Sequence, residues 1–278
     1  MPPSDPRLRA AARRARRALS VLNLPGGRPA RAVPAPTGQR LVPEPVFVIS
    51  SVRSGSTLLR VLLNSHPRIR APHEMHLRTL HVEQTKPYTE KAMSQLGLDE
   101  KELEHLLWDR VLHRELEHSG KDLIVDKTPG NALVWERLHE AWPDAKFLFL
   151  LRHPASMVSS LINGRPDRDP AQTIAEVKSY VDAVEDARTH LPGLTVRYED
   201  LTGDAEAKTR EICTFLGVEW DARMLNYGKQ DHGPFKAYIG DWSDNIKSGS
   251  VQQARALPAA EEVPDDLRDI AHTWGYAC

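Results

Sequence analysis

Residues 46–63 read VFVISSVRSGSTLLRVLL. This stretch opens with a short apolar run, continues through a loop of small residues, and ends in an apolar run typical of a helix. A strand that passes through a glycine-containing loop into a helix is typical of a phosphate-binding loop. The Gly-Lys-Ser/Thr ending that nucleotide triphosphatases use for phosphates and magnesium is missing. The loop therefore predicts an anion site whose cation, Arg53, precedes Gly55.

The rest of the chain alternates between strand-like and helix-like segments. Strands are predicted at residues 46–50, 69–74, 122–127, 146–152 and 194–201. Helices are predicted at about residues 90–118, 131–142, 154–162, 171–191 and 206–217. Short apolar strands separated by helices indicate a parallel sheet that is covered on both faces. The predicted fold class is α/β, a single domain with a central parallel sheet flanked by helices, and its ligand loops lie at the carboxyl ends of the strands.

The composition suits a globular protein with an unusual beginning. The chain has 278 residues, of which 40% are apolar and 27% charged, so one large α/β domain can bury a core. Residues 1–40 carry nine arginines and one acidic residue, which leaves 28 basic and 37 acidic residues in the remainder. An acidic body does not favour nucleic acid as a partner. We expect a basic, Pro/Gly-rich arm and linker at residues 1–44 and the main domain at residues 45–278.

The arm has helical spacing of apolar residues at residues 7–22, with arginines mostly on the other side. A basic amphipathic helix can dock on an acidic carrier protein or lie on an anionic membrane surface. The alternative is a solvated arm that packs loosely on the acidic body. No apolar run approaches the roughly 20 residues that span a bilayer. We therefore expect a cytoplasmic protein, and a location at the membrane periphery is the alternative.

A second anion site is indicated by the sequence RHPASMVSS. Arg152 ends an apolar strand, Pro154 suits a first helical turn, and Ser160 lies two helical turns further on. A buried strand rarely ends in arginine without an anion or a carboxylate partner. Alone, this pattern also fits a structural ion pair. Together with the first loop, it indicates a ligand with two separated phosphate-like groups.

These two elements resemble a known family. SVRSGSTLLRVLLNSHP resembles the phosphosulfate-binding loop of sulfotransferases that use 3′-phosphoadenosine 5′-phosphosulfate (PAPS), and RHPASMVSS resembles their 3′-phosphate motif. The segments IVDKTP, VRYEDL with the following TFLGV, and IKSGS occur in the family's order. The resemblance covers about residues 45–258 and implies a P-loop nucleotide-kinase-like fold. It also implies PAPS as the donor, 3′-phosphoadenosine 5′-phosphate (PAP) as its product, and no required metal.

The resemblance further implies a role for each matching residue. Lys127 would stabilise the bridging oxygen as it departs, while Arg152 and Ser160 would bind the 3′-phosphate. The residues implied to bind the 5′-phosphate are Arg53, Ser54, Gly55, Ser56 and Thr57. Weaker candidates for the 3′-phosphate pocket are Arg165 and Tyr198, and the segment implied to close over the nucleotide is Lys247, Ser248, Gly249 and Ser250, with Arg255 as a looser candidate.

The general base is implied by a departure from one branch of the family. Cytosolic small-molecule sulfotransferases carry Lys-Thr-His, whereas this sequence reads Lys127-Thr128-Pro129. Tyrosylprotein and heparan-type sulfotransferases instead use a glutamate shortly after the phosphate-loop helix, and Glu74 lies there. The chain is thus closer to this glutamate-base branch and to bacterial sulfotransferases. His76, which makes a Glu-x-His arrangement, and His73 remain alternatives, because an imidazole can also accept a proton near neutral pH.

The predicted function is sulfuryl transfer from PAPS to a hydroxyl of an unidentified acceptor. A small metabolite, a glycolipid and a carrier-tethered intermediate all remain open as that acceptor. One alternative is a P-loop kinase or nucleotide hydrolase, which would need a magnesium-binding Ser/Thr after a loop lysine. The other is a non-catalytic nucleotide-binding protein that keeps the fold.

Overall fold

The computed structural model describes residues 40–233, 246 and 248–277. These residues belong to a compact unit that runs from Gln39 to Cys278. The predicted basic arm lies outside the described residues as far as position 39, and so does Lys247 of the predicted nucleotide-closing segment.

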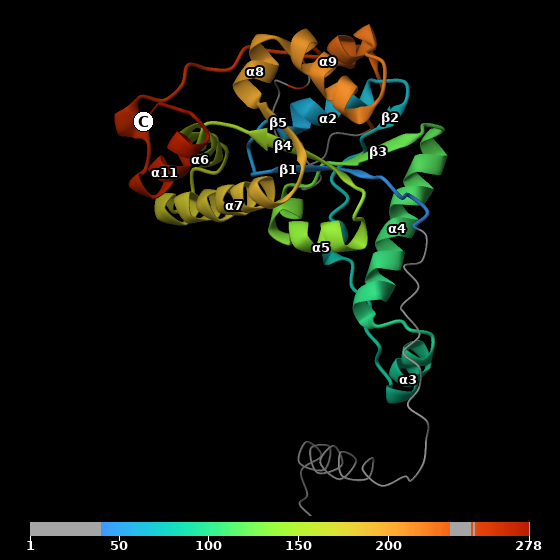
Figure 1. The fold of residues 1–278 in the computed structure, drawn as a ribbon. Coiled ribbons are helices and arrows are strands. Elements are labelled where there is room, and N and C mark those ends of the chain that lie inside the picture. Colours follow the sequence, from blue (N-terminus) through green and yellow to red (C-terminus); the bar gives the residue numbers. More distant parts are fainter. Residues whose placement is uncertain (1–39, 234–245, 247, 278) are drawn as a thin grey trace, which may run out of the picture. The chain divides into compact units, whose positions relative to one another are not determined.

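A parallel sheet forms the centre of this unit and confirms the predicted fold class (Figure 1). Its strand order is β2-β3-β1-β4-β5, and every neighbouring pair is parallel. The strands are β1 (Val46–Ser50), β2 (Ile69–Arg70), β3 (Leu123–Asp126), β4 (Lys146–Leu151) and β5 (Gly193–Arg197). Because β1 lies in the middle, the loop that follows it has strands on both sides.

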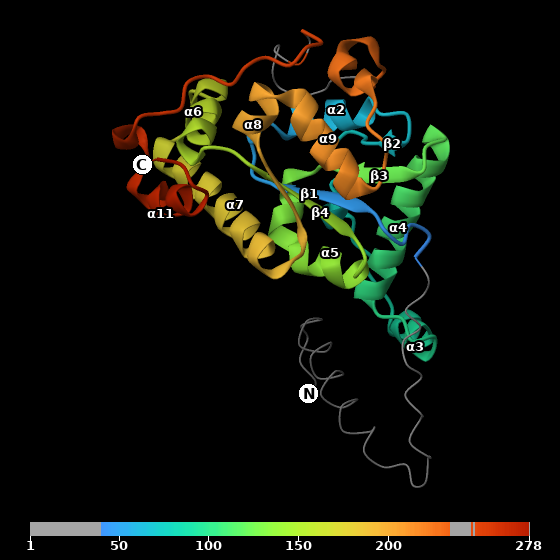
Figure 2. The ribbon, with the colours of Figure 1, turned by 45° about the horizontal axis from the view of Figure 1, so that its top comes forward.

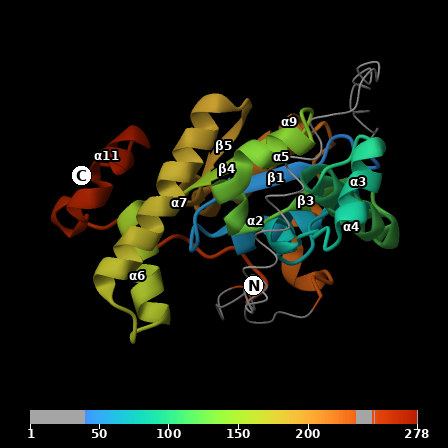
Figure 3. The ribbon, with the colours of Figure 1, turned by 90° about the horizontal axis from the view of Figure 1, so that it is seen from below.

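Helices cover both faces of the sheet, as Figures 1 and 3 show. One face carries α2 (Ser56–Asn64), α8 (Tyr198–Gly203) and α9 (Ala205–Leu216), and the other carries α5 (Trp135–Ala141) and α7 (Pro170–His190). Alternate residues of β1 point to opposite faces, so Val46 and Val48 pack in one core cluster while Phe47 and Ile49 pack in the other. All four side chains are fully buried.

The helical stretch predicted at residues 90–118 is divided into two helices, α3 (Pro87–Gln95) and α4 (Glu100–Ser119). Gly97 between them has a φ of 75°, in the left-handed region that ends helices. Asp99 then caps α4 by accepting a hydrogen bond from the backbone N–H of Glu102 at 2.7 Å. Figure 2 shows α3 beyond the end of α4, away from the sheet, and none of its residues is buried.

The other elements are shorter or lie at the edge of the sheet. They are η1 (Leu77–Thr79), η2 (Pro129–Val134), α6 (Pro154–Gly164), η3 (Ala222–Lys229), η4 (Ala260–Glu262) and α11 (Asp265–Thr273). The extended stretch predicted at residues 69–74 shrinks to the two residues of β2, and the predicted strand at 194–201 ends at Arg197, where α8 begins. Among the described residues, no helix is long and apolar enough to cross a membrane.

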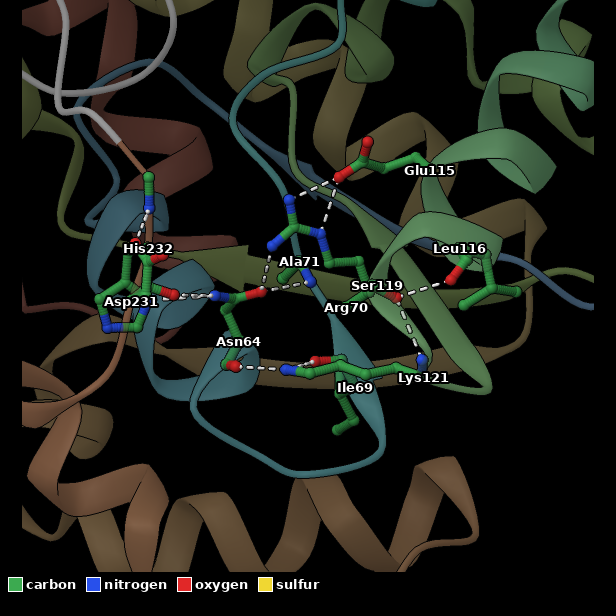
Figure 4. A network of polar contacts seen from close by, with 11 residues as sticks. Asn64, Ile69, Arg70, Ala71, Glu115, Leu116, Ser119, Lys121, Asp231 and His232 are labelled. Carbon is green, nitrogen blue, oxygen red and sulfur yellow. Dashed lines mark hydrogen bonds and ion pairs between the residues drawn. The ribbon is translucent and has the colours of Figure 1, made fainter.

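A polar network fixes the C-terminal end of α2, the end away from the loop that follows β1 (Figure 4). Lys121 Nζ donates hydrogen bonds to the carbonyl oxygens of Asn64, His66 and Ile69 at 2.7, 3.0 and 2.8 Å. Burial lowers the pKa of Lys121 to about 8. Asn64 Oδ1 in turn accepts a hydrogen bond from the backbone N–H of Ala71 at 3.1 Å. The network thus ties α2 to the segment that leads towards Glu74.

Candidate functional site

The loop after β1 has the backbone geometry of an anion-binding turn. Gly55 has a φ of 85° and is the N-cap of α2, whose first turn is not capped by a side chain. A Cβ atom at this position would lie 2.2 Å from Cδ2 of Tyr198, so the ring of Tyr198 excludes any larger residue here. Arg53 also has a positive φ, 60°, which is uncommon outside glycine. The loop therefore presents uncapped N–H groups and a cation at one end of a helix, where an anion binds favourably.

Arg152, at the end of β4, joins this loop. Its Nη1 atom donates a hydrogen bond to the carbonyl oxygen of Arg53 at 2.8 Å, and its guanidinium lies 4.5 Å from the ring centre of Tyr198. Burial lowers the pKa of Arg152, which nevertheless stays charged because an arginine pKa starts above 12. Its Nε atom is buried and has no hydrogen-bond partner among the described residues. A buried cation with an unused donor is suited to binding an anion.

Ser160 lies beside Arg53 in the structure. Arg53 Nε donates to Ser160 Oγ at 3.0 Å. The sequence had assigned Arg53 and Ser160 to different phosphates. The structure brings both of them, with Arg152, to the edge of one cavity.

Glu74 faces a buried lysine. Lys127 Nζ lies 2.5 Å from Glu74 Oε1, and the Lys127 side chain is completely buried while that of Glu74 is 13% exposed. Burial lowers the pKa of Lys127, and the carboxylate of Glu74 opposes this shift. The other carboxylate oxygen, Oε2, lies 3.4 Å from Nε2 of His76, whose side chain is 40% exposed. The predicted Glu-x-His arrangement thus brings both side chains together.

A cavity of about 920 Å³ connects these groups at the carboxyl ends of the strands. Glu74, the predicted general base, and the predicted phosphate-binding loop after β1 both line this cavity. The predicted residues that line it are Arg53, Gly55, Ser56, Thr57, Glu74, Arg152, Ser160, Arg165, Tyr198, Ser250 and Arg255.

Six predicted residues in the described part of the chain do not line this cavity. Ser54 is fully buried, and its hydroxyl has no hydrogen-bond partner among the described residues. Lys127 reaches the cavity only through Glu74. Gly249 packs against Gly228, whose N–H donates to its carbonyl oxygen at 3.1 Å. The remaining three are His73, His76 and Ser248.

Sequence reasoning assigned no role to Glu199, which holds the surroundings of Arg152 in place. Its Oε1 atom accepts a hydrogen bond from the backbone N–H of His153 at 3.1 Å, and its Oε2 atom accepts one from Tyr276 Oη at 2.7 Å. Burial raises the pKa of Tyr276, so this hydroxyl remains a donor. The signal was present in VRYEDL, where Glu199 follows Tyr198 directly.

The arrangement supports two chemical tasks. The loop, Arg53 and Arg152 can bind a ligand with more than one anionic group, and the carboxylate of Glu74 can accept a proton from a group in the cavity. In the described part of the chain, no three His, Cys, Asp or Glu side chains are grouped so as to hold a metal ion.

Comparisons with known proteins identify the family of this chain. Residues 45–222 match the family described as the sulfotransferase family. Protein-tyrosine sulfotransferase A of Caenorhabditis elegans is 25% identical over 197 residues, which cover 66% of this chain and 52% of that protein. Nodulation protein NoeE of Sinorhizobium fredii is 26% identical over 208 residues, covering 62% of this chain and 50% of NoeE. The chain spans about half the length of these two relatives.

Two solved structures share the fold. The sulfotransferase domain from the curacin biosynthetic pathway superimposes with a TM-score of 0.65 at 23% identity, covering 84% of this chain and 98% of that domain. The corresponding domain of the Synechococcus PCC 7002 olefin synthase gives a TM-score of 0.64 at 24% identity, covering 84% and 95%. The family match includes β1 to β5, the β1 loop, Glu74, Lys127 and Arg152. This chain belongs to the sulfotransferase family.

Proposed function

We propose that this protein transfers a sulfuryl group from PAPS to a hydroxyl of an acceptor, with Glu74 as the general base. One observation carries the proposal. The carboxylate of Glu74, 2.5 Å from the buried ammonium of Lys127, lies on the same cavity as Arg53 and Arg152. A proton acceptor and two cations that can bind anions are therefore available to a donor and an acceptor bound in the same cavity.

The residues that line the cavity fit a donor of this kind. Arg53, the uncapped start of α2 and Arg152 supply positive charge, and Arg152 Nε has no partner of its own among the described residues. Two carboxylates on the cavity are already engaged: Glu199 accepts hydrogen bonds from Tyr276 and His153, and Glu176 pairs with Arg168. Their repulsion towards an anionic ligand is thereby reduced. We assign Arg53, Ser56 and Thr57 to the 5′-phosphate side.

Bound PAPS would supply an activated sulfuryl group, and the remaining work falls to side chains of this protein. Glu74 accepts the proton of the acceptor hydroxyl on a carboxylate oxygen. Lys127 Nζ holds this carboxylate in place and brings a buried positive charge near the site where negative charge develops on the departing oxygen. Sulfuryl transfer then depends mainly on positioning and on electrostatic stabilisation, as phosphoryl transfer does.

The acceptor is proposed only as a class, a molecule with a hydroxyl. The name of the nematode relative points to a tyrosine hydroxyl, and the curacin domain belongs to a biosynthetic pathway. A small metabolite, a glycolipid and a carrier-tethered intermediate therefore all remain within the proposal. A cytoplasmic location, and an acidic carrier or membrane surface as the partner of the arm, remain predictions from the sequence.

The experiment is a comparison of ligands by isothermal titration calorimetry. We expect PAP to bind much more tightly than AMP and ATP, because only PAP carries both a 3′-phosphate and a 5′-phosphate. In Arg152→Ala, the preference for PAP over AMP should shrink by roughly 10- to 100-fold, the loss expected for one charge-assisted hydrogen-bonding partner. A protein that ignores PAP, or that hydrolyses ATP with magnesium, would overturn the proposal in favour of a nucleotide hydrolase or kinase.

A further inference from the structure

Thr128, the residue after the buried lysine, makes contacts that link two parts of the site. It is fully buried. Its Oγ1 atom accepts hydrogen bonds from the backbone N–H groups of Met75 and His76, at 3.2 and 3.4 Å. These are the two residues directly after Glu74. The hydroxyl therefore attaches the loop that carries the proposed base to the end of β3.

Asp126 fixes the direction of this hydroxyl. Thr128 Oγ1 donates its hydrogen to Asp126 Oδ1 at 2.8 Å, and Asn131 Nδ2 donates to Asp126 Oδ2 at 3.0 Å. Because the hydroxyl has one hydrogen and gives it to Asp126, its lone pairs face the two N–H groups. The carboxylate of Asp126 is 1% exposed and touches neither Glu74 nor the cavity directly. Burial raises the pKa of Asp126, and the two hydrogen bonds oppose that shift.

The backbone of the Glu74 loop needs this support. His76 has a φ of 50°, a left-handed conformation that is uncommon outside glycine, although histidine adopts it more often than most residues do. Such a conformation persists where the surrounding contacts determine it. The bond from His76 N–H to Thr128 is one of those contacts. Glu74, which contacts Lys127, lies two residues earlier on the same loop.

We propose that Thr128, oriented by Asp126, is a positioning residue that holds the Glu74 carboxylate against Lys127 and at the cavity wall. The role rests on the proposed function, since it gives Thr128 a catalytic consequence only if Glu74 is the base. Neither Asp126 nor Thr128 lines the cavity, so neither one is assigned contact with donor or acceptor.

The test compares Thr128→Val with Thr128→Ser. Valine has nearly the same shape but has no hydroxyl, whereas serine keeps the hydroxyl and loses only a methyl group. We expect turnover in Thr128→Val to fall roughly 10- to 100-fold, the cost of a displacement of about 1 Å at the reacting group. PAP affinity should stay close to that of the wild type, and Thr128→Ser should recover most of the turnover.

A matched control is Thr209→Val. Thr209 is also fully buried, and its hydroxyl donates to Ala205 at 2.7 Å and accepts from Trp220 Nε1 at 2.8 Å, far along the chain from Glu74. This variant should lose thermal stability without losing turnover. If Thr128→Val fails to fold, Asp126→Asn, which keeps the side-chain shape, should show a smaller fall in turnover at unchanged PAP affinity.

A crystal structure of Thr128→Val, or of Asp126→Asn if valine is not tolerated, separates failure of this proposal from failure of the proposed function. Loss of the Lys127–Glu74 contact would support positioning even if no sulfuryl transfer is found in the wild type. A retained contact with an unchanged backbone at residues 74–76 would overturn it, and so would wild-type turnover in Thr128→Val. An equal fall in PAP affinity and turnover would likewise count against it, because that pattern indicates a general structural role.

Discussion

Arg53 donates a hydrogen bond from Nε to Oγ of Ser160 across 3.0 Å, and this bond joins the β1 loop to α6. The two elements are 107 residues apart in the chain. The two segments that the sequence assigned to separate phosphates are thus joined by a direct side-chain contact.

This contact predicts that Arg53 and Ser160 contribute to donor binding in a coupled way. In a double-mutant cycle with Arg53→Lys and Ser160→Ala, PAP affinity should show an interaction energy of about 0.5–3 kcal/mol, as for residues in direct contact. Calorimetry on the four proteins measures it. Ser159→Ala is the matched control, because Ser159 lines the same cavity and directly precedes Ser160 in α6. Additive effects for Ser160 would contradict the coupling.

Glu74→Gln should abolish turnover while donor binding is retained. Glutamine keeps the shape and still offers Lys127 an acceptor oxygen, but it cannot act as a general base. The loss of a general base typically lowers the rate by about 100- to 10,000-fold. Steady-state turnover and PAP calorimetry on the same preparation check both parts. His76→Gln is the companion variant. If it removes turnover and Glu74→Gln does not, the base is the imidazole.

Gly55→Ala should reduce both stability and donor affinity. A positive φ costs an L-residue about 1–2 kcal/mol, and the new methyl group would also meet the ring of Tyr198. Chemical denaturation and PAP calorimetry measure the two effects. Gly217→Ala separates them, since Gly217 has a φ of 77° with nothing within 4 Å of its Cβ position. That control should lose stability alone. Unchanged PAP affinity in Gly55→Ala would show that Tyr198 adapts freely.

Lys121 predicts a particular pH dependence of stability. Its folded pKa of about 8 lies below the ordinary lysine pKa of 10.5, so between these values the unfolded chain binds a proton that the folded chain has released. Stability contributed by this group therefore rises with pH across that window. Urea denaturation from pH 7 to pH 10 should show the wild type gaining on Lys121→Met.

An exposed lysine provides the comparison for this measurement. Lys91 lies on α3, where no residue is buried, so Lys91→Met should follow the wild type at every pH. Parallel curves for the wild type and Lys121→Met would show that Lys121 titrates alike in the folded and unfolded chains.

The sheet could be predicted because its strands are short apolar runs bounded by loops. The residues of β1, β3 and β4 fell within the predicted ranges, β5 began one residue before its predicted range, and alternation with helices gave the parallel arrangement. The order of the strands could not be read in the same way. Local patterns fix which segments are strands, whereas their order depends on contacts between residues far apart in the sequence.

The candidate site was predictable in its members but not in its contacts. Arg53, Glu74 and Arg152 follow from motifs, and all three line one cavity. The burial of Lys127 behind Glu74 depends on the neighbouring positions of β2 and β3, which no local pattern contains. Thr128 belongs to the IVDKTP segment, but its contacts with the backbone of Met75 and His76 join residues more than 50 positions apart, so no local pattern predicts them.

Ser50 at the end of β1 pairs with Leu150 near the end of β4. The turns that carry Arg53 and Arg152 follow these two strands. The distance between the turns is therefore set by main-chain hydrogen bonding between adjacent strands, which lie about 4.8 Å apart. Side chains on the covering helices can then diverge without moving one turn relative to the other. This gives a physical reason why an architecture shared at only 23% identity can tolerate extensive replacement elsewhere.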